Sequence, residues 1–224
     1  TDGSISSTVS ASATSGFSIV SYTGTGANAT IGHGLGSVPK MIITKSTGAV
    51  AGWGVYHQSL GNTNALFLEE STATSANSVY WNNTSPTSSV FSVGSAGAMN
   101  NTNGMIAYCF AEKQGYSKFG SYTGNGNADG TFVYTGFKPA FLMVKNISTT
   151  DDWRMFDNKR PGINVINDEL KANLYNAEGA GDKMDFLSNG VKFRVSTAVN
   201  ASNTYIYMAF AEEPLVGDNP ATAR

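Results

Sequence analysis

The chain has 224 residues, and only 13% of them are charged, which is about half the usual share in globular proteins. The formal net charge is −2 and the longest positive run is Lys159-Arg160, so the composition disfavours binding to nucleic acid. No apolar run approaches the roughly 20 residues of a membrane helix, which argues against membrane insertion. The single cysteine, Cys109, excludes an internal disulfide and a cysteine-rich metal site, and its apolar neighbours indicate a buried side chain.

Residues 1–16 form a lead-in that is rich in Ser, Thr and Ala. Between residues 4 and 10 the pattern alternates weakly around Ile5 and Val9, which indicates extended backbone. This pattern is compatible with an extended arm, an added edge strand or a disordered segment.

Short apolar runs between clusters of Gly, Ser, Thr and Asn predict β-strands throughout the chain. The turn clusters recur roughly every dozen residues, as they do in β-sandwiches and β-barrels. Strands are expected at residues 41–43, 55–57, 66–68, 78–81, 89–93, 105–111, 141–144, 153–156, 170–174, 191–195 and 205–211. Residues 168–176 could also form one or two helical turns, and no long amphipathic helix is visible.

The two halves of the chain repeat one another at a nearly constant offset. Ser21-Tyr22-Thr23-Gly24 recurs 100 residues later as Ser121-Tyr122-Thr123-Gly124. The same offset relates Pro39 to Pro139, Trp53 to Trp153 and residues 107–112 to residues 207–212, whereas Phe91 corresponds to Phe193 at an offset of 102. Anchors that stay in register across the whole chain indicate internal duplication.

The sequence therefore predicts an all-β protein with two tandem antiparallel β-sandwich domains, which are jelly-roll-like and related by internal duplication. The first repeat spans residues 17–113 and the second spans residues 118–214. Residues 114–117 form a short linker between the repeats, and residues 215–224 form a loose C-terminal tail.

No motif indicates an active site, so we expect that the protein is not an enzyme. The glycine-rich string at residues 32–36 lacks the following helix that a phosphate-binding loop requires, and the second repeat has Phe132-Val133-Tyr134-Thr135-Gly136 in its place. His33 and His57 are the only histidines, whereas a metal site needs three or four converging donors. We expect no catalytic residue, no metal site and no cofactor.

The acidic residues are sparse and form no evident catalytic pair. Asp151-Asp152 and Asp168-Glu169 are adjacent in sequence, so a strand would direct the members of each pair to opposite faces. The two carboxylates of a glycosidase would have to converge from different strands, which nothing in the pattern indicates. Residues 125–130 carry oxygen donors at alternate positions but no closing Glu, so a hairpin turn is favoured over a calcium site.

Aromatic side chains are the better binding candidates, because their faces suit the apolar faces of sugar rings. The candidate ligand-binding residues are Trp53, Trp81, Trp153, Tyr22, Tyr122 and His33. For Trp53 and Trp153 the alternative is core packing, since they occupy equivalent positions in the two repeats. Trp81 has no such match and precedes Asn82-Asn83, so it is favoured as a surface residue.

Several long strings, of which Gly16-Phe17-Ser18-Ile19-Val20-Ser21-Tyr22-Thr23-Gly24 is one, resemble the C-terminal repeat domains of tail-fibre-like virion structural proteins of marine tailed phages. The other similar strings are residues 32–35, 39–43, 108–113, 115–124 and 185–190, and the resemblance extends over residues 3–224. It implies a phage structural protein at the virion surface, a tail fibre or appendage domain with a role in recognising a host receptor or glycan. The missing initial Met agrees with a fragment or a processed part of a longer chain.

Tail fibres are commonly trimers, so the resemblance also implies a homotrimer that contacts other virion proteins. Two other functions stay open at this point. One is a purely structural capsid or tail decoration module, and the other, with the least support, is a polysaccharide-degrading enzyme. The segments that differ between the repeats, at His33, Trp81 and residues 151–168, are where a distinct function is expected.

Overall fold

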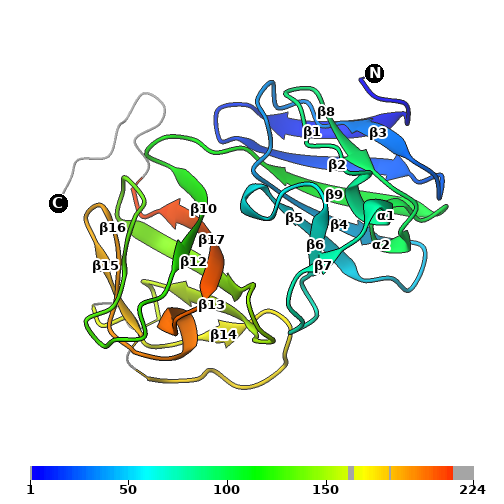
Figure 1. Ribbon diagram of the computed structural model, residues 1–224. Coiled ribbons are helices and arrows are strands. Elements are labelled where there is room, and N and C mark those ends of the chain that lie inside the picture. Colours follow the sequence, from blue (N-terminus) through cyan, green and yellow to red (C-terminus); the bar gives the residue numbers. More distant parts are fainter. Residues whose placement is uncertain (1, 161–163, 182, 214–224) are drawn as a thin grey trace. The chain divides into compact units, whose positions relative to one another are not determined.

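The computed structural model describes residues 2–160, 164–181 and 183–213, and β-strands dominate it (Figure 1). Its sheets are antiparallel, which confirms the all-β fold class. The chain divides into two compact units. The first contains the described residues up to 69 and residues 74–112, and the second contains residues 70–73 and the described residues from 113 onward. Within the described ranges no helix is long and apolar enough to span a membrane.

The first unit contains a seven-stranded sheet and a two-stranded sheet. The strand order in the large sheet is β1 (Ser7–Ser12), β2 (Phe17–Thr23), β9 (Gly104–Phe110), β4 (Met41–Ser46), β5 (Trp53–His57), β6 (Asn64–Phe67) and β7 (Ser75–Ala76). The small sheet pairs β3 (Ala29–Gly32) with β8 (Val90–Val93). The short helical elements of this unit are α1 (Ser78–Trp81), α2 (Gly97–Asn100) and the 3-10 turn η1 (Gln58–Leu60).

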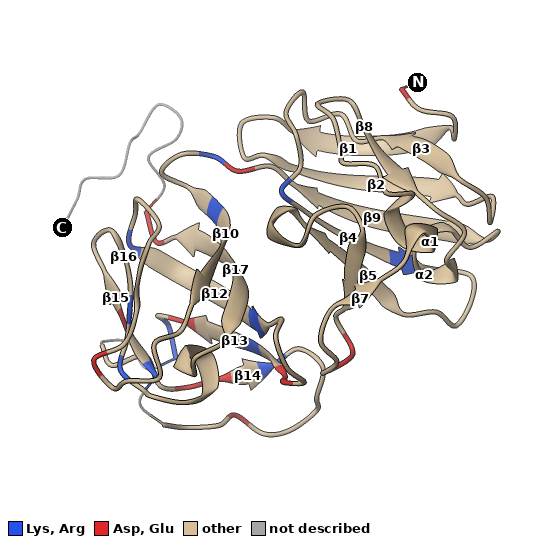
Figure 2. Cartoon of the chain, in the orientation of Figure 1, with Lys and Arg blue, Asp and Glu red and all other residues tan. Residues whose placement is uncertain are grey.

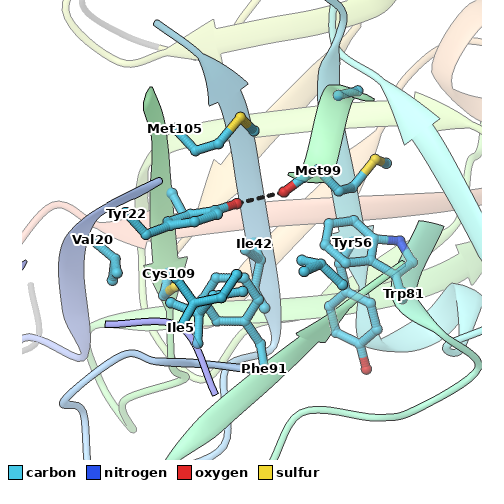
Figure 3. Close-up of a cluster of buried hydrophobic side chains, with 14 of the residues drawn as sticks. Ile5, Val20, Tyr22, Ile42, Tyr56, Trp81, Phe91, Met99, Met105 and Cys109 are labelled. Carbon is cyan, nitrogen blue, oxygen red and sulfur yellow. Dashed lines mark hydrogen bonds between the residues drawn. The ribbon is translucent and has the colours of Figure 1, made fainter. Parts of the chain in front are cut away.

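The core of the first unit combines residues from both of its sheets and from α1. Burial alternates along β2, so Val20 and Tyr22 enter the core. Phe91 of the small sheet and Trp81 of α1 pack into the same cluster (Figure 3). Cys109 lies there as a buried free cysteine, as its apolar neighbours in the sequence predict.

The lead-in is an added edge strand of the first unit. β1 pairs with β2 along its whole length, with Ser7 opposite Tyr22. Ahead of β1, the backbone N–H of Ile5 donates to Thr30 O, and the Ile5 side chain is buried in the core. Because backbone pairing and an apolar anchor both hold it, the lead-in belongs to the first unit.

The second unit contains a five-stranded sheet and a three-stranded sheet. The order in the large sheet is β10 (Ser117–Thr123), β17 (Thr204–Ala211), β12 (Pro139–Asn146), β13 (Trp153–Asp157) and β14 (Leu170–Lys171). The order in the small sheet is β11 (Phe132–Tyr134), β16 (Gly190–Phe193) and β15 (Met184–Leu187). Its core again combines residues of both sheets, such as Leu142, Phe156, Val191 and Phe193. A 3-10 turn, η2 (Ala198–Asn200), precedes β17.

Residues 70–73 belong to the second unit, although the residues on both sides of this segment belong to the first. Its carbonyl Ser71 O accepts two hydrogen bonds, from Lys145 Nζ at 3.1 Å and from the N–H of Asp151 at 2.9 Å. The sequence pattern does not predict that these residues belong to the second unit, because the composition of a polar loop does not indicate which sheet the loop contacts.

Three expectations about the fold need correction. Residues 78–81 form the helix α1 instead of a strand. Residues 168–176 contain the two-residue strand β14 instead of helical turns, because Leu170 and Lys171 pair with β13. The sheets of each unit are unequal in size, which differs from the two matched sheets of a jelly roll. The expected C-terminal tail, residues 215–224, lies outside the described residues.

Matched contacts occur at matched positions in the two units. In the first, Asn100 is fully buried and its Oδ1 accepts the N–H of Thr25 at 2.8 Å. In the second, Asn200 is fully buried and its Oδ1 accepts the N–H of Asn125 at 3.3 Å. The partners as well as the two asparagines are 100 residues apart, so the offset seen in the sequence extends to buried hydrogen bonds.

Candidate functional site

The structure buries five of the six side chains that the sequence suggested as ligand contacts. At most 8% of the surface is exposed for Trp81, Trp153, Tyr22, Tyr122 and His33. Only Trp53 keeps part of its surface in solvent. A buried ring offers no face to a sugar, so the five buried side chains stabilise the two cores.

Trp81 is the clearest correction, because its place before Asn82-Asn83 favoured the surface. Its ring packs in the core of the first unit, edge-on to Tyr56 with 5.7 Å between ring centroids (Figure 3). Capping explains the burial. Asn77 accepts the N–H of Val79 at the start of α1, and Asn82 ends the helix with a φ of 50°, so a single helical turn carries Trp81 inward.

Tyr22 and Tyr122 use their hydroxyls inside the cores. Tyr22 donates to Met99 O at 2.5 Å (Figure 3), and Tyr122 donates to Val199 O at 2.6 Å. Burial raises the pKa of both phenols, so they remain neutral donors over the ordinary pH range. Both hydroxyls therefore hold the short helical turn, α2 or η2, that precedes the last strand of their unit.

Both histidines hold backbone groups. His33 Nδ1 accepts the N–H of Leu35 at 3.3 Å, so Nε2 carries the proton and donates to Thr87 O at 3.1 Å. Burial lowers the pKa of His33, which keeps this ring neutral. His57 Nδ1 accepts the N–H of Ser59 at the start of η1. Among the described residues, no three His, Cys, Asp or Glu side chains lie close enough to hold a metal ion.

Trp53 and Trp153 occupy matched positions in β5 and β13 but have different surroundings. Lys45 Nζ lies 5.5 Å from the centroid of the Trp53 ring, in a cation–π contact. The corresponding lysine, Lys145, is opposite Trp153 in the sheet, and both of these side chains are buried. Core packing, the alternative that the sequence left open, therefore applies to Trp153 and only in part to Trp53.

Lys145 is a buried cation held by carbonyl groups. Its Nζ donates to Asp151 O at 2.8 Å, to Asn146 O at 3.0 Å and to Ser71 O at 3.1 Å. Burial is the main reason why the pKa of Lys145 falls to about 8, and the charges of Asp151 and Asp152 oppose that fall. These contacts attach residues 70–73 to the end of β12.

Charged side chains gather in the second unit (Figure 2). Asp151 and Glu169, which are far apart in the sequence, converge on Arg154: its Nη2 lies 2.9 Å from Asp151 Oδ1 and its Nη1 lies 2.8 Å from Glu169 Oε1. Burial alone would lower the pKa of Arg154, but the two carboxylates raise it. Two carboxylates that share one guanidinium form an ion-pair network, unlike the substrate-facing pair of a glycosidase.

The loop at residues 125–130 is a series of side-chain turns. Asn125 Oδ1 accepts the N–H of Asn127 at 3.0 Å, and Asn127 Oδ1 accepts the N–H of Asp129 at 2.9 Å. The side-chain oxygens at alternate positions therefore serve the backbone, as in Asx turns. The loop joins β10 to β11, which lie in different sheets, so it is a turn between two sheets and the expected hairpin is wrong.

Two aromatic rings are exposed on β11, an edge strand of the three-stranded sheet. Phe132 is 43% exposed and Tyr134 is 63% exposed, while Val133 between them is buried in the core. Strand alternation thus places both rings on the outer face of the sheet. In the sequence this string marks only a difference between the repeats, because three residues are too few to reveal which face is outward.

The cross-strand register explains how the two rings lie. Tyr134 is opposite Gly190 and Phe132 is opposite Lys192. A Cβ on Gly190 would lie 2.8 Å from Phe132 Cζ, so the Phe132 ring reaches diagonally across this glycine. Tyr134 leans along its own strand, with its hydroxyl 3.6 Å from the place of a Cβ on Gly136. The rings therefore spread over the outer face in two directions.

Two ion pairs involve Lys192, which is opposite Phe132 in the sheet, and Arg194, which is two residues further along the chain. Lys192 Nζ is 2.6 Å from Asp129 Oδ1, and Arg194 Nη2 is 2.6 Å from Asp185 Oδ2. The hydrogen bond from Lys192 lowers the pKa of Asp129, so this carboxylate is ionised at neutral pH. The Asp129 side chain is 84% exposed and can accept hydrogen bonds from ligand hydroxyls. We refer to Phe132, Tyr134 and these two ion pairs as the β11 surface.

The positions 100 residues earlier in the first unit are Gly32 and Gly34. A Cβ on Gly32 would lie 2.7 Å from Asp2 O, and a Cβ on Gly34 would lie 3.0 Å from Val9 Cγ1. In the first unit the lead-in thus covers the end of β3 and the residues that follow it, and glycine leaves room for the lead-in. The second unit has exposed rings at the same positions.

Comparison with protein families gives one assignment. A family described as Domain of unknown function (DUF7483) matches residues 1–214. The chain belongs to this family. Neither the curated proteins nor the solved structures gave a match. The DUF7483 match includes the lead-in and the β11 surface, so both are parts of the family's domain in this chain.

Proposed function

We propose that this DUF7483 protein is a phage virion structural protein, a tail-fibre or appendage domain, which binds a host-surface glycan through the β11 surface. The observation that carries the proposal is the pair of exposed rings, Phe132 and Tyr134, beside hydrogen-bonding side chains. The resemblance of long strings in the sequence to marine tailed-phage proteins supports the virion assignment.

The chemistry of the β11 surface suits a sugar. A sugar ring has apolar C–H faces and a hydroxyl rim, so it combines well with an aromatic face that is bordered by polar groups. The apolar part of the surface is two rings, which is small compared with the roughly 800 Å² per partner of a stable protein interface. A glycan therefore fits this surface better than a second protein does.

We also propose that the two units are β-sandwich copies that arose by internal duplication. The support is the constant offset of 100 residues in the anchors and in buried hydrogen bonds such as those of Asn100 and Asn200. Since duplication supplies two scaffolds, a difference between them can serve binding without loss of the fold. The β11 surface, with glycines at the matched positions, is such a difference.

The expected setting is the virion surface, where a homotrimer contacts other virion proteins and presents three copies of the β11 surface. Such multivalency would raise the avidity for a cell surface covered with many copies of one glycan. The support for this setting is the phage resemblance alone.

A glycan array probed with the soluble full chain tests the proposal. We expect binding to glycans of the host surface, and we expect the double variant Phe132→Ala/Tyr134→Ala to lose it. Tyr175→Ala is the matched control, because Tyr175 is fully exposed but lies outside the three-stranded sheet.

Retained binding by the double variant would show that the β11 surface is not the site. If the chain binds no host glycan but binds a purified virion protein through Phe132 and Tyr134, the structural decoration role replaces glycan recognition. Release of sugar from the host polysaccharide would instead indicate a degrading enzyme.

A further inference from the structure

We infer that the ligand of the β11 surface is an uncharged glycan of at least two sugar residues, which lies along β11 so that Phe132 and Tyr134 contact neighbouring sugars. This inference rests on the proposed glycan-binding function and adds the charge and the length of the ligand to it. Two independent features of the surface carry it, the spread of the rings and the pairing of the charges.

The spread of the rings sets the length. Side chains two positions apart on a strand start about 7 Å from one another on the same face. Phe132 then reaches across Gly190 of β16, whereas Tyr134 leans along β11 toward Gly136. Because one ring lies over Gly190 and the other leans toward Gly136, we expect a single sugar to stack on one ring at a time. A second sugar of the same chain is needed to use the other ring.

The pairing of the charges sets the ligand's charge. Lys192 is opposite Phe132 in the sheet, and Arg194 is two residues further along the chain. Each of these cations has a carboxylate partner at 2.6 Å, Asp129 and Asp185 respectively. Lys192 Nζ also donates to Gly130 O. A carboxylate or sulfate on the ligand would have to compete with these partners, and it would also be repelled by them. Sugar hydroxyls need no such exchange, because they can donate to the exposed Asp129 carboxylate.

In the first unit, glycines occupy the positions that match Phe132 and Tyr134, and the lead-in covers the surface there. At Gly32 and Gly34 the lead-in residues Asp2 and Val9 occupy the space that side chains would fill. A lead-in that followed the same path over the second unit would collide with Phe132 and Tyr134. The rings therefore exclude an extended peptide in that path, and this favours a ligand that rests on top of them.

The test measures the affinity of the full chain for matched oligosaccharides. The probes are neutral homo-oligomers of glucose, galactose or mannose, one to four sugars long, and their uronic acid counterparts of the same linkage and length. For the neutral series that binds, we expect the tetramer to bind at least about tenfold more tightly than the monosaccharide. We expect the uronic counterparts to bind more weakly, and the neutral affinity to change little between low and high salt.

Variants sharpen the test. Phe132→Ala or Tyr134→Ala alone should reduce the tetramer affinity toward that of the monosaccharide, while Tyr175→Ala should leave it unchanged. Asp129→Asn removes the partner of Lys192 and should raise the affinity for uronic oligomers severalfold, with a new dependence on salt.

The outcomes separate the two proposals. Preference for the uronic series, or equal affinity for the monosaccharide and the tetramer, overturns the inference and leaves glycan binding intact. Absence of binding to every neutral and acidic probe, together with a negative glycan array, overturns both.

Discussion

Phe132 Cζ lies 2.8 Å from the point that a Cβ would occupy on Gly190, and Val133 O lies only 2.2 Å from that same point. Gly190 therefore has two roles, since it allows β11 to approach β16 closely and it leaves space for the Phe132 ring. Aromatic rings often cover glycines across strands in this way.

Gly190→Ala should thus weaken both the sheet and the binding surface. Because the new Cβ meets a backbone oxygen as well as the ring, we expect a loss of about 1–3 kcal/mol in the free energy of unfolding. Glycan affinity at a temperature where the variant is folded should fall at least about tenfold. Urea denaturation and glycan titration measure the two effects. Gly97→Ala is the control, since a Cβ there meets only Asn101 Nδ2 at 3.5 Å.

Asn100→Ala and Asn200→Ala should destabilise the protein to a similar extent. Each asparagine is fully buried and bonds backbone groups of one loop, the loop after β2 for Asn100 and the loop after β10 for Asn200. Each buried group left without a partner costs about 1–3 kcal/mol, so we expect a total of about 3 kcal/mol or more. Thermal unfolding measures it, and Asn62→Ala, which removes an exposed hydrogen bond, should be nearly neutral. A large effect in one unit alone would contradict the structural equivalence of the two asparagines.

Trp81→Ala and Phe132→Ala should have opposite effects. Trp81 fills the first core, so its removal should cost about 3–5 kcal/mol of stability and leave the glycan affinity of the folded protein unchanged. Phe132 is largely outside the core, so its removal should change stability little and reduce the affinity for a tetrasaccharide toward that for a monosaccharide. Chemical denaturation and glycan titration on both variants decide this. If folded Trp81→Ala protein loses glycan binding, the binding site lies in the first unit and not at the β11 surface.

Lys145 should make stability depend on pH in an unusual direction. Its pKa is about 8 in the folded protein and near 10.4 in an unfolded chain, so between these values the unfolded state binds more protons. Raising the pH from 8 to 10 should therefore increase the contribution of Lys145 to stability. The unfolding free energy of the wild type minus that of Lys145→Met should therefore increase as the pH rises from 8 to 10.

The matched control for this measurement is Lys45→Met, at the corresponding position of β4. Buried tyrosines such as Tyr22, whose pKa is raised, act in the opposite direction as the pH passes 10, so the comparison stops there. If the unfolding free energy of the wild type minus that of Lys145→Met decreases from pH 8 to 10, the lowered pKa of the buried Lys145 is contradicted.

Much of the scaffold could be predicted from the sequence, because strands leave a periodic pattern of apolar residues and the two halves share anchors at a constant offset. Cys109 was placed correctly in the core, since it lies within a long apolar run. For the lead-in the sequence is compatible with three alternatives, and the buried Ile5 together with the β1 pairing shows an edge strand. The order of strands in the sheets depends on contacts between distant segments, for which a single sequence carries no signal.

The candidate site was missed for a physical reason. An aromatic residue near polar residues is not always exposed: Trp81 turns inward because Asn77 and Asn82 cap a helical turn. That pair of asparagines was the available signal for α1. The exposure of Phe132 and Tyr134 follows from the position of β11 at a sheet edge, which the three-residue strand itself does not encode.

Residues 70–73 belong to the second unit but lie within the sequence of the first, and this determines how the chain can be cut into fragments. No single cut in the backbone yields both units whole, since these four residues lie between two segments of the first unit. A fragment that starts at residue 113 lacks Ser71 O, the acceptor for both Lys145 Nζ and the N–H of Asp151. The smallest self-sufficient expression unit for the half that carries the β11 surface is therefore the whole chain or a graft that carries these four residues with it.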